Sequence, residues 1–176
     1  MTTRSASPNH IQRGTNPVAA DPRRQEKISA LRTLPGEVRK AITGLSDPQL
    51  DTPYRDGGWT VRQVVHHIAD SHMNAYIRAR LILTENNPTL KPYDQNSWAR
   101  LIDAAGAPVA PSLAIIDGVH ERLVQLFENC GESDWSLPAQ HPESGAMTLE
   151  KILNMYSGHG RNHVGQILGL RKQKGW

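Results

Sequence analysis

The stretch TVRQVVHHIADSHMNAYIRARLIL, residues 60–83, is the part of the sequence that decides the fold class. Thr60 precedes a periodic run and Gln63 follows three residues later, so the two side chains can form a capping box at a helix start. Apolar residues then recur at helical spacings: Val61, Val64, Val65, Ile68, Ala75, Tyr76 and Leu83. The stretch therefore predicts one long amphipathic helix with a face to bury.

Three more segments carry the same periodicity, at about residues 22–45, 112–130 and 149–172. Pro35 is expected to bend or interrupt the first, and Thr148 is expected to cap the last. A short helix is predicted in SWARLIDA, residues 97–104, with Ser97 as its cap. No run shows the sustained alternation of a strand. Four long amphipathic helices joined by loops predict an all-α four-helix bundle.

The length and composition fit one domain preceded by an arm. The chain has 176 residues, enough to bury a core without disulfides. Residues 1–21 are polar and aperiodic and are predicted to be a flexible N-terminal arm, while residues 22–176 form the bundle domain. The single cysteine, Cys130, cannot form an internal disulfide. No segment suits a signal peptide or a membrane span, so the expected location is the cytoplasm.

The charge balance argues against a nucleic-acid partner. The chain carries 20 Lys and Arg residues against 17 Asp and Glu residues, a net charge of +3. The basic residues are scattered, and the nearest approach to a cluster is Arg171, Lys172 and Lys174, which suits a helix C-terminus. Without a basic stripe the sequence predicts no nucleic-acid binding.

Five of the eight histidines fall into two groups: His66, His67 and His72, then His159 and His163. Residues four apart lie one above the other on a helix. His159 and His163 can therefore both reach one ion at the ~2.0–2.1 Å typical of zinc–nitrogen bonds. The other histidines are isolated in the sequence and no role is predicted for them: His10, His120 and His141.

The pair His159 and His163 lies on an apolar helical stripe. That stripe is formed by Ile152, Tyr156, His159, His163, Ile167 and Leu170. Buried imidazoles without partners are costly, and their charged forms repel one another. A metal ion solves both problems because it binds neutral ring nitrogens; hydrogen bonds to backbone or buried water are the alternative. Gly160 stands where H-E-x-x-H has its glutamate, so the pair does not predict a metalloprotease.

A third ligand should come from a facing helix, and periodicity leaves the choice open. His66 has polar side chains one turn away on either side, which predicts a more solvated face. His72 shares the most apolar face and His67 lies between the two, so His67 and His72 are equally good candidates. Asp70 could be a fourth ligand, an acceptor behind His67 or a solvent-facing carboxylate.

Three stretches resemble the DinB-like superfamily of four-helix bundles, in particular its YfiT subgroup of metal-dependent hydrolases. They are GWTVRQVVHHIADSHMN (58–74), LTENNPTLKPYDQNSWARL (83–101) and YSGHGRNHVGQI (156–167). With the helix order, the resemblance covers about residues 25–175. It implies a metal held by three histidines, one of which is the histidine before Ile68. This favours His67 over His72 and makes His159 and His163 the other two ligands.

The resemblance also implies a function. It suggests a cytoplasmic hydrolase of a small-molecule substrate, often a homodimer, with one divalent ion per chain, zinc first and nickel as the alternative. Three protein ligands leave an open coordination position for activating water, as in catalytic sites. Other members of the superfamily resemble transferases of bacillithiol or mycothiol, so thiol transfer and non-catalytic metal binding are the rival hypotheses. Asp70, His72 and Asn74 are equal candidates for the general acid or base.

Overall fold

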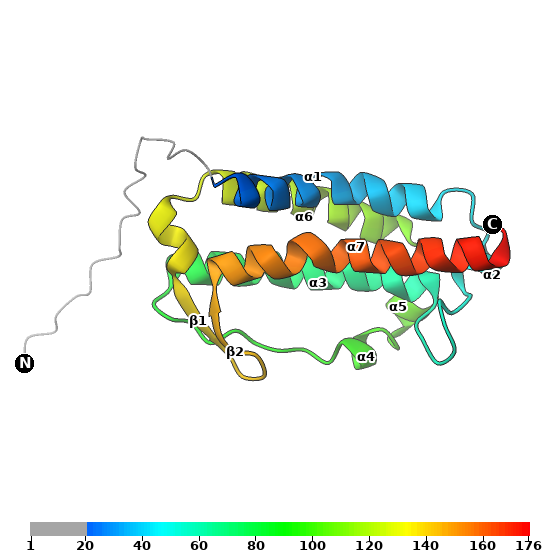
Figure 1. The fold of residues 1–176 in the computed structure, drawn as a ribbon. Helices are drawn as coiled ribbons and strands as arrows, with labels where there is room; N and C mark the ends of the chain where they lie inside the picture. The colour runs from blue at the N-terminus through cyan, green and yellow to red at the C-terminus, as the bar shows by residue number, and fades with distance from the viewer. Residues whose placement is uncertain (1–20) are drawn as a thin grey trace, which may run out of the picture.

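The computed structural model describes residues 21–176; most of the predicted arm, and His10 with it, lies outside the described residues. Four long helices form a bundle (Figure 1), and the predicted all-α four-helix-bundle class is confirmed. They are α1 (Pro22–Ile42), α3 (Val61–Thr84), α6 (Ala110–Glu128) and α7 (Leu149–Lys174). Shorter elements join them: α2 (Asp47–Leu50), α4 (Gln95–Trp98), α5 (Ile102–Ala105), the 3-10 helix η1 (Glu132–Ser136) and the strands β1 (Pro138–His141) and β2 (Gly145–Thr148).

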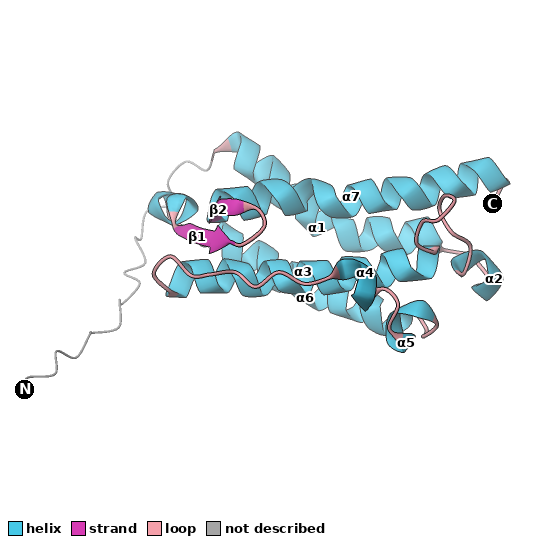
Figure 2. Cartoon of the chain, turned by 90° about the horizontal axis from the view of Figure 1, so that it is seen from below, coloured by secondary structure: helices cyan, strands magenta, loops and turns pink. Residues whose placement is uncertain are grey.

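The helices run in pairs of opposite direction. In Figure 1, α1 and α7 run one way along the bundle, and α3 and α6 run the other way. Helix α1 packs against α6 and α7, and α3 packs against the same two helices, so the four form a closed ring. The long connection from α3 to α6 must return along the bundle, and Figure 2 shows it passing beside α3 with α4 and α5 on its way.

The helix starts follow from their capping residues. The Thr60 side chain accepts from the backbone N–H of Gln63, and the Gln63 side chain accepts in return from the backbone N–H of Thr60, which confirms the capping box. Thr148 caps α7 by accepting from the backbone N–H of Lys151. Asp21 caps α1 by accepting from the backbone N–H of Arg23.

A polar layer divides the hydrophobic core into two clusters. One cluster holds Ala75 of α3 and Tyr156 of α7, and the other holds Ala69 of α3 and Val164 of α7. The buried histidines lie between the two: His72 and His120 are 0% and 1% exposed. Because a buried polar group must be paired, this layer needs partners that the apolar clusters cannot give.

Helix α1 continues through Pro35, so the proline does not interrupt it, and the expected bend stays a prediction. Two other local predictions were wrong. The SWARLIDA segment forms two short helices in place of one, and Asp94, not Ser97, caps the first of them. Residues 138–148 form a β-hairpin, with Pro138 opposite Thr148. Its four-residue strands are too short for a visible alternation, and Gly145 makes the turn with φ +72°.

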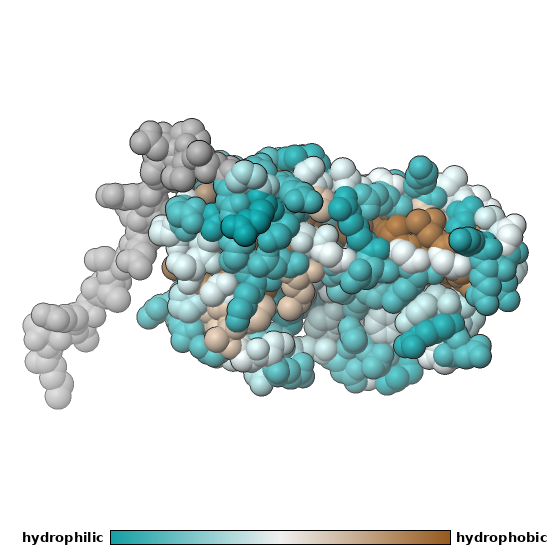
Figure 3. Space-filling model, viewed as in Figure 1, coloured by the Kyte–Doolittle hydropathy of each residue, from teal (hydrophilic) through white to brown (hydrophobic). Residues whose placement is uncertain are grey.

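The hairpin holds the α3–α4 connection against the bundle. The backbone N–H of Leu90 donates to the carbonyl of Gln140 at 2.7 Å, and the N–H of Gln140 donates to the carbonyl of Pro88 at 2.9 Å. Leu90 is fully buried as a result. The exterior in Figure 3 is mainly hydrophilic, with a small apolar area towards the C-terminal part of α7. Within residues 21–176, no helix is apolar over enough of its length to cross a bilayer.

Candidate metal centre

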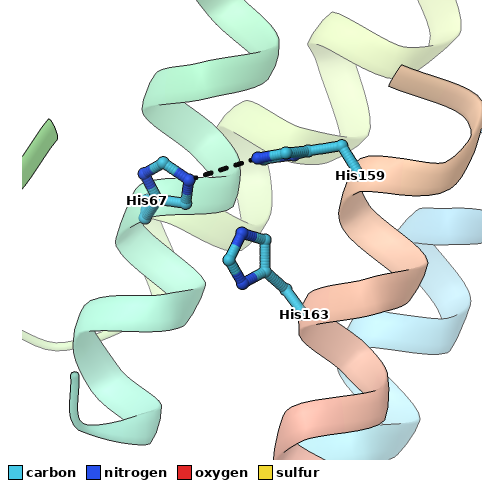
Figure 4. Close-up of side chains that lie close together, drawn as sticks. All are labelled: His67, His159 and His163. Atoms are coloured by element: carbon cyan, nitrogen blue, oxygen red, sulfur yellow. Dashed lines mark hydrogen bonds between the residues drawn. The ribbon is translucent and has the colours of Figure 1, made fainter. Parts of the chain in front are cut away.

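Three imidazoles from two neighbouring helices point at one another (Figure 4). His67 comes from α3, and His159 and His163 come from successive turns of α7. One ring nitrogen from each residue lies within 4.8 Å of the other two. The Nε2 atoms of His67 and His159 are 3.3 Å apart. The predicted i, i+4 pair and the histidine before Ile68 are therefore brought together.

The three rings are held in their neutral form. Burial, with the neighbouring His163 and His159 rings adding to it, lowers the pKa of His67 to about 3. Burial and His163 lower the pKa of His159 to about 4. Burial also lowers the pKa of His163, partly offset by its bond to Gln166. Neutral imidazoles have a free lone pair, which is the form that a metal requires.

The spacing of the nitrogens fits a divalent ion. Two ligands at ~2.0–2.1 Å from one tetrahedral ion stand roughly 3.3–3.4 Å apart, and the two Nε2 atoms of His67 and His159 are 3.3 Å apart. His163 Nδ1 lies 2.9 Å from Gln166 Oε1, an oxygen that can only accept. His163 therefore donates from Nδ1, and its Nε2 keeps the lone pair. The donor set of three imidazole nitrogens suits zinc and nickel.

His72 contacts the same histidine from behind. His72 Nε2 lies 3.2 Å from Nδ1 of His159, while His67 contacts Nε2 of His159. The two candidates that periodicity could not separate therefore address opposite nitrogens of one ring. Only His67 shares the convergence point with His163.

Two histidines differ from their sequence-based prediction. His66 was expected on a more solvated face, but it is 6% exposed because Ser112 Oγ lies 2.7 Å from its Nδ1 and the Ala107 carbonyl lies 3.2 Å from its Nε2. His120 was given no role, yet it is buried and bonded to His72 at 2.9 Å. Only the packing of α6 against α3 reveals this contact, because the two residues are 48 positions apart.

A cavity of about 570 Å³ opens beside His159, one of the three histidines. It reaches His159 and is walled by Tyr156 and Met155 of α7 and by Ser71 and Arg78 of α3. Its outer wall comes from the segments outside the bundle: Pro92, Tyr93, Asp94, Gln95, His141 and Glu143. The cavity thus gives a small molecule access to one of the three converging histidines, His159.

Aromatic side chains lie next to two of the three histidines and along the cavity. The Trp59 ring centroid is 4.6 Å from that of His67 and 6.3 Å from that of His163. Trp98 is at the surface and packs on Tyr93. Tyr93 lines the cavity, and burial raises its pKa. The Tyr93 hydroxyl therefore stays protonated and can donate a hydrogen bond.

A carboxylate and an amide follow His67 on α3, those of Asp70 and Asn74. Burial and the neighbouring Asp103 raise the pKa of Asp70, while His66 lowers it. Asn74 donates to the backbone carbonyl of Asp70. Neither residue is among those that line the cavity. His72 is buried between two other imidazoles and does not line the cavity either, so the three predicted acid–base candidates stay predictions.

Gly160 is required by the close approach of α7 to α1. A Cβ atom at this position would overlap the Leu34 side chain, so only glycine fits without a shift. A glutamate between the two ligands of α7, as in H-E-x-x-H, has no room here. The packing of the helices therefore agrees with the sequence in excluding that arrangement.

Comparison with known proteins identifies the family. The model of the DinB superfamily matches residues 30–167. This chain belongs to the DinB superfamily. A protein of Geobacillus kaustophilus named "Putative metal-dependent hydrolase" is 47% identical over 154 residues, covering 86% of each chain. A Bacillus cereus protein of the same name is 49% identical over 149 residues, covering 85% of this chain and 86% of the relative.

The same family appears among solved structures. The structure described as "YfiT from Bacillus subtilis is a probable metal-dependent hydrolase with an unusual four-helix bundle topology" superimposes with a TM-score of 0.87 and 39% identity. The match covers 93% of this chain and 94% of YfiT. The resemblance to the YfiT subgroup that the sequence motifs predicted is therefore confirmed.

Proposed function

We propose that this DinB-superfamily protein is a metal-dependent hydrolase whose single divalent ion, zinc in the first place and nickel as the alternative, is held by His67, His159 and His163. The observation that carries the proposal is the convergence of three neutral imidazole nitrogens within 4.8 Å, one of them from His159, which also lines an open cavity. The names of relatives that are 47–49% identical support the same reaction class.

The ligand set leaves room for catalysis. Three neutral protein ligands are typical of catalytic sites, in which a further coordination position stays open. When bound, a divalent ion supplies Lewis acidity and can lower the pKa of water to about 7. The chain contributes the shape of the site: Trp59 packs beside two of the rings, and the cavity admits substrate at His159.

The cavity wall offers a hydrogen-bond donor that the sequence did not single out. His141 Nδ1 accepts hydrogen bonds from the backbone N–H groups of Glu143 and Ser144, each at 3.3 Å. A neutral ring that accepts at Nδ1 carries its proton at Nε2. His141 lines the cavity, so its Nε2–H is the group we assign to donate a hydrogen bond to the substrate.

Arg78 gives the cavity a cationic group. Its Nη2 donates to the Lys91 carbonyl at 2.8 Å, and its buried Nε has no hydrogen-bond partner among the described residues. The carboxylate of Asp94 also lines the cavity, but it accepts from the backbone N–H groups of Asn96 and Ser97. Glu143 adds a second carboxylate, so the lining carries one guanidinium group and two carboxylates.

Metal analysis beside turnover tests this function. Purified wild-type protein should hold about one equivalent of zinc or nickel and hydrolyse members of an ester and amide panel, whereas His163→Ala should lose both the metal and the activity. His66→Gln is the matched control, because His66 is also a buried histidine but lies outside the cluster. A full equivalent of metal in His163→Ala would contradict the assigned ligands.

The panel should include bacillithiol and mycothiol with an electrophile, since the same three histidines would serve thiol transfer. If the rate of thiol conjugation exceeds the rate of every hydrolysis in the panel, thiol transfer replaces hydrolysis as the proposed reaction. If the metal-loaded protein converts no compound of the panel, metal binding is its only activity. The homodimer and the lack of nucleic-acid binding stay predictions, which light scattering and a DNA-binding titration can check.

A further inference from the structure

A line of hydrogen bonds leads from the candidate metal centre through the interior of the bundle. His159 Nδ1 lies 3.2 Å from His72 Nε2, and His72 Nδ1 lies 2.9 Å from His120 Nε2. His120 Nδ1 lies 2.7 Å from the backbone carbonyl oxygen of Leu31. These four groups, which we call the histidine chain, belong in turn to α7, α3, α6 and α1. The line thus includes every long helix of the bundle.

The chain ends at a carbonyl that its own helix does not use. In an α-helix the carbonyl of residue 31 bonds to the N–H of residue 35. Residue 35 is Pro35, inside α1, and proline has no N–H. The Leu31 oxygen is therefore free to accept from His120, and α1 avoids an unpaired buried carbonyl.

The carbonyl at one end fixes the direction of every bond in the chain. A carbonyl oxygen can only accept, so His120 donates from Nδ1. His72 and His120 are fully buried, which keeps both rings neutral, and a neutral imidazole donates from one nitrogen and accepts at the other. His120 Nε2 therefore accepts from His72 Nδ1. His72 Nε2 in turn accepts from His159 Nδ1.

We propose that the histidine chain positions the metal ligand His159 by fixing its tautomer. With the proton held on Nδ1, the lone pair of His159 is on Nε2, the nitrogen 3.3 Å from His67. His72 and His120 are positioning residues and contact no substrate. This role deepens the proposed function and rests on its metal site, whereas the tautomer itself is a property of the metal-free protein.

The chain also explains how two buried histidines are tolerated between apolar clusters. Each ring nitrogen of His72 and His120 has a partner within 3.2 Å. A fully satisfied polar network fixes a single arrangement, while a broken one leaves a buried group unpaired. Partners that orient a ligand histidine typically contribute 10–100-fold to metal affinity, which is the size of effect expected here.

Long-range proton–nitrogen NMR of the full-length, metal-free wild-type protein tests the tautomers directly. His72, His120 and His159 are expected to carry their protons on Nδ1, which is the less common form of a neutral histidine in water. A proton on Nε2 of His72 or His159 would overturn the proposal. Because this measurement needs neither metal nor a variant, no folding defect can hide the result.

Zinc affinity of a variant tests the consequence. His120→Leu removes the acceptor of His72 and the donor to Leu31, and competition with a chromophoric chelator should show affinity 10–100-fold lower than wild type. His66→Leu is the matched control: it also removes a buried, doubly bonded histidine from the α3–α6 interface, but it lies outside the chain. We expect His66→Leu to keep the zinc affinity of the wild type within about threefold, because the His66 ring pairs with Ser112 and Ala107 and with no member of the histidine chain.

The outcomes separate the two proposals. Wild-type affinity in His120→Leu, or an equal loss in His66→Leu, would overturn the positioning role and leave the proposed hydrolase intact. Conversely, wild-type protein that shows the expected tautomers but binds no zinc would refute the metal site while the fixed tautomer of His159 stands.

Discussion

The two nitrogens of His159 face two regions built from the same residue type but with opposite designs. On the Nε2 side, His67 and His163 converge with His159 on one point. On the Nδ1 side, His72 and His120 form a line in which every nitrogen has a partner. In the first region the nitrogens face one another, as in the 3.3 Å contact between Nε2 of His67 and Nε2 of His159, whereas in the second they pair one after another along the line.

The difference shows that the surroundings, not the residue type, decide what a buried histidine can do. Burial lowers the pKa of His72 well below its usual value, as it does for the three converging histidines. All these rings are therefore neutral at pH 7. What separates them is whether their nitrogens converge on one point or pair one after another along a line. The following predictions test that distinction.

The largest expected effect is the loss of stability of the metal-free protein in acid. Folding lowers the pKa of His67 to about 3 and of His159 to about 4, from 6.5 when unfolded. The unfolded chain therefore binds more protons as the pH falls from 6.5 towards 4, and stability decreases with falling pH. Each such histidine costs about 1.4 kcal/mol per pH unit, measurable by urea unfolding at several pH values. His67→Ala should reduce the slope; an unchanged slope would contradict the neutral cluster.

Removal of the metal should be the next largest effect. A ligand that binds only the folded protein stabilises it by about 2.7 kcal/mol at a hundred times its dissociation constant. Zinc should therefore raise the unfolding midpoint of the wild-type protein, and a chelator should reverse the rise. His67→Ala should show no response to either, whereas His66→Gln should respond like wild type. A zinc response that survives in His67→Ala would assign the ion to another region.

A smaller effect is expected where α7 meets α1 behind the ligands. Gly160→Ala would place a methyl group against Leu34 and should destabilise the protein by about 1–3 kcal/mol through overpacking. Gly169→Ala on the same helix is the control, because a Cβ there meets nothing within 4 Å. This control should be neutral or stabilising by up to about 1 kcal/mol from helix propensity. Equal behaviour of the two variants in thermal unfolding would refute the close contact.

The smallest effect is expected at the far end of the histidine chain. Pro35→Ala restores an N–H that competes for the Leu31 carbonyl, so the His120 bond should weaken by less than about 1 kcal/mol. Zinc affinity should fall a few-fold while the thermal midpoint stays level or rises, because proline is a poor residue inside a helix. A loss of stability with unchanged affinity would show that the proline serves packing alone.

The sequence predicted the parts of the site that depend on local spacing. The Thr60 capping box and the four-residue spacing of His159 and His163 can be read directly from the chain, and the structure has both as helix features. Periodicity could not separate His67 from His72, since each contacts His159 and only the ring nitrogen differs. The resemblance to known proteins was needed to favour His67.

The rest depended on packing between distant segments. His120 is isolated in the sequence, and its bond to Leu31 spans 89 residues. His66 was misjudged because its ring faces Ser112 and the Ala107 carbonyl instead of water. One feature of the sequence does indicate this bond. A proline four residues after Leu31 leaves the Leu31 carbonyl without its partner in the helix, so the carbonyl needs a donor from another helix.

The site is built from two kinds of element, the long helices of the bundle and the segments that connect them. The nitrogen donors and their support come from the long helices, whereas much of the outer wall comes from the α3–α4 connection and the hairpin. Those two pieces are fastened to each other through Leu90 and Gln140. Insertions or exchanges there could retune which molecule is accepted while the reactive centre is inherited unaltered.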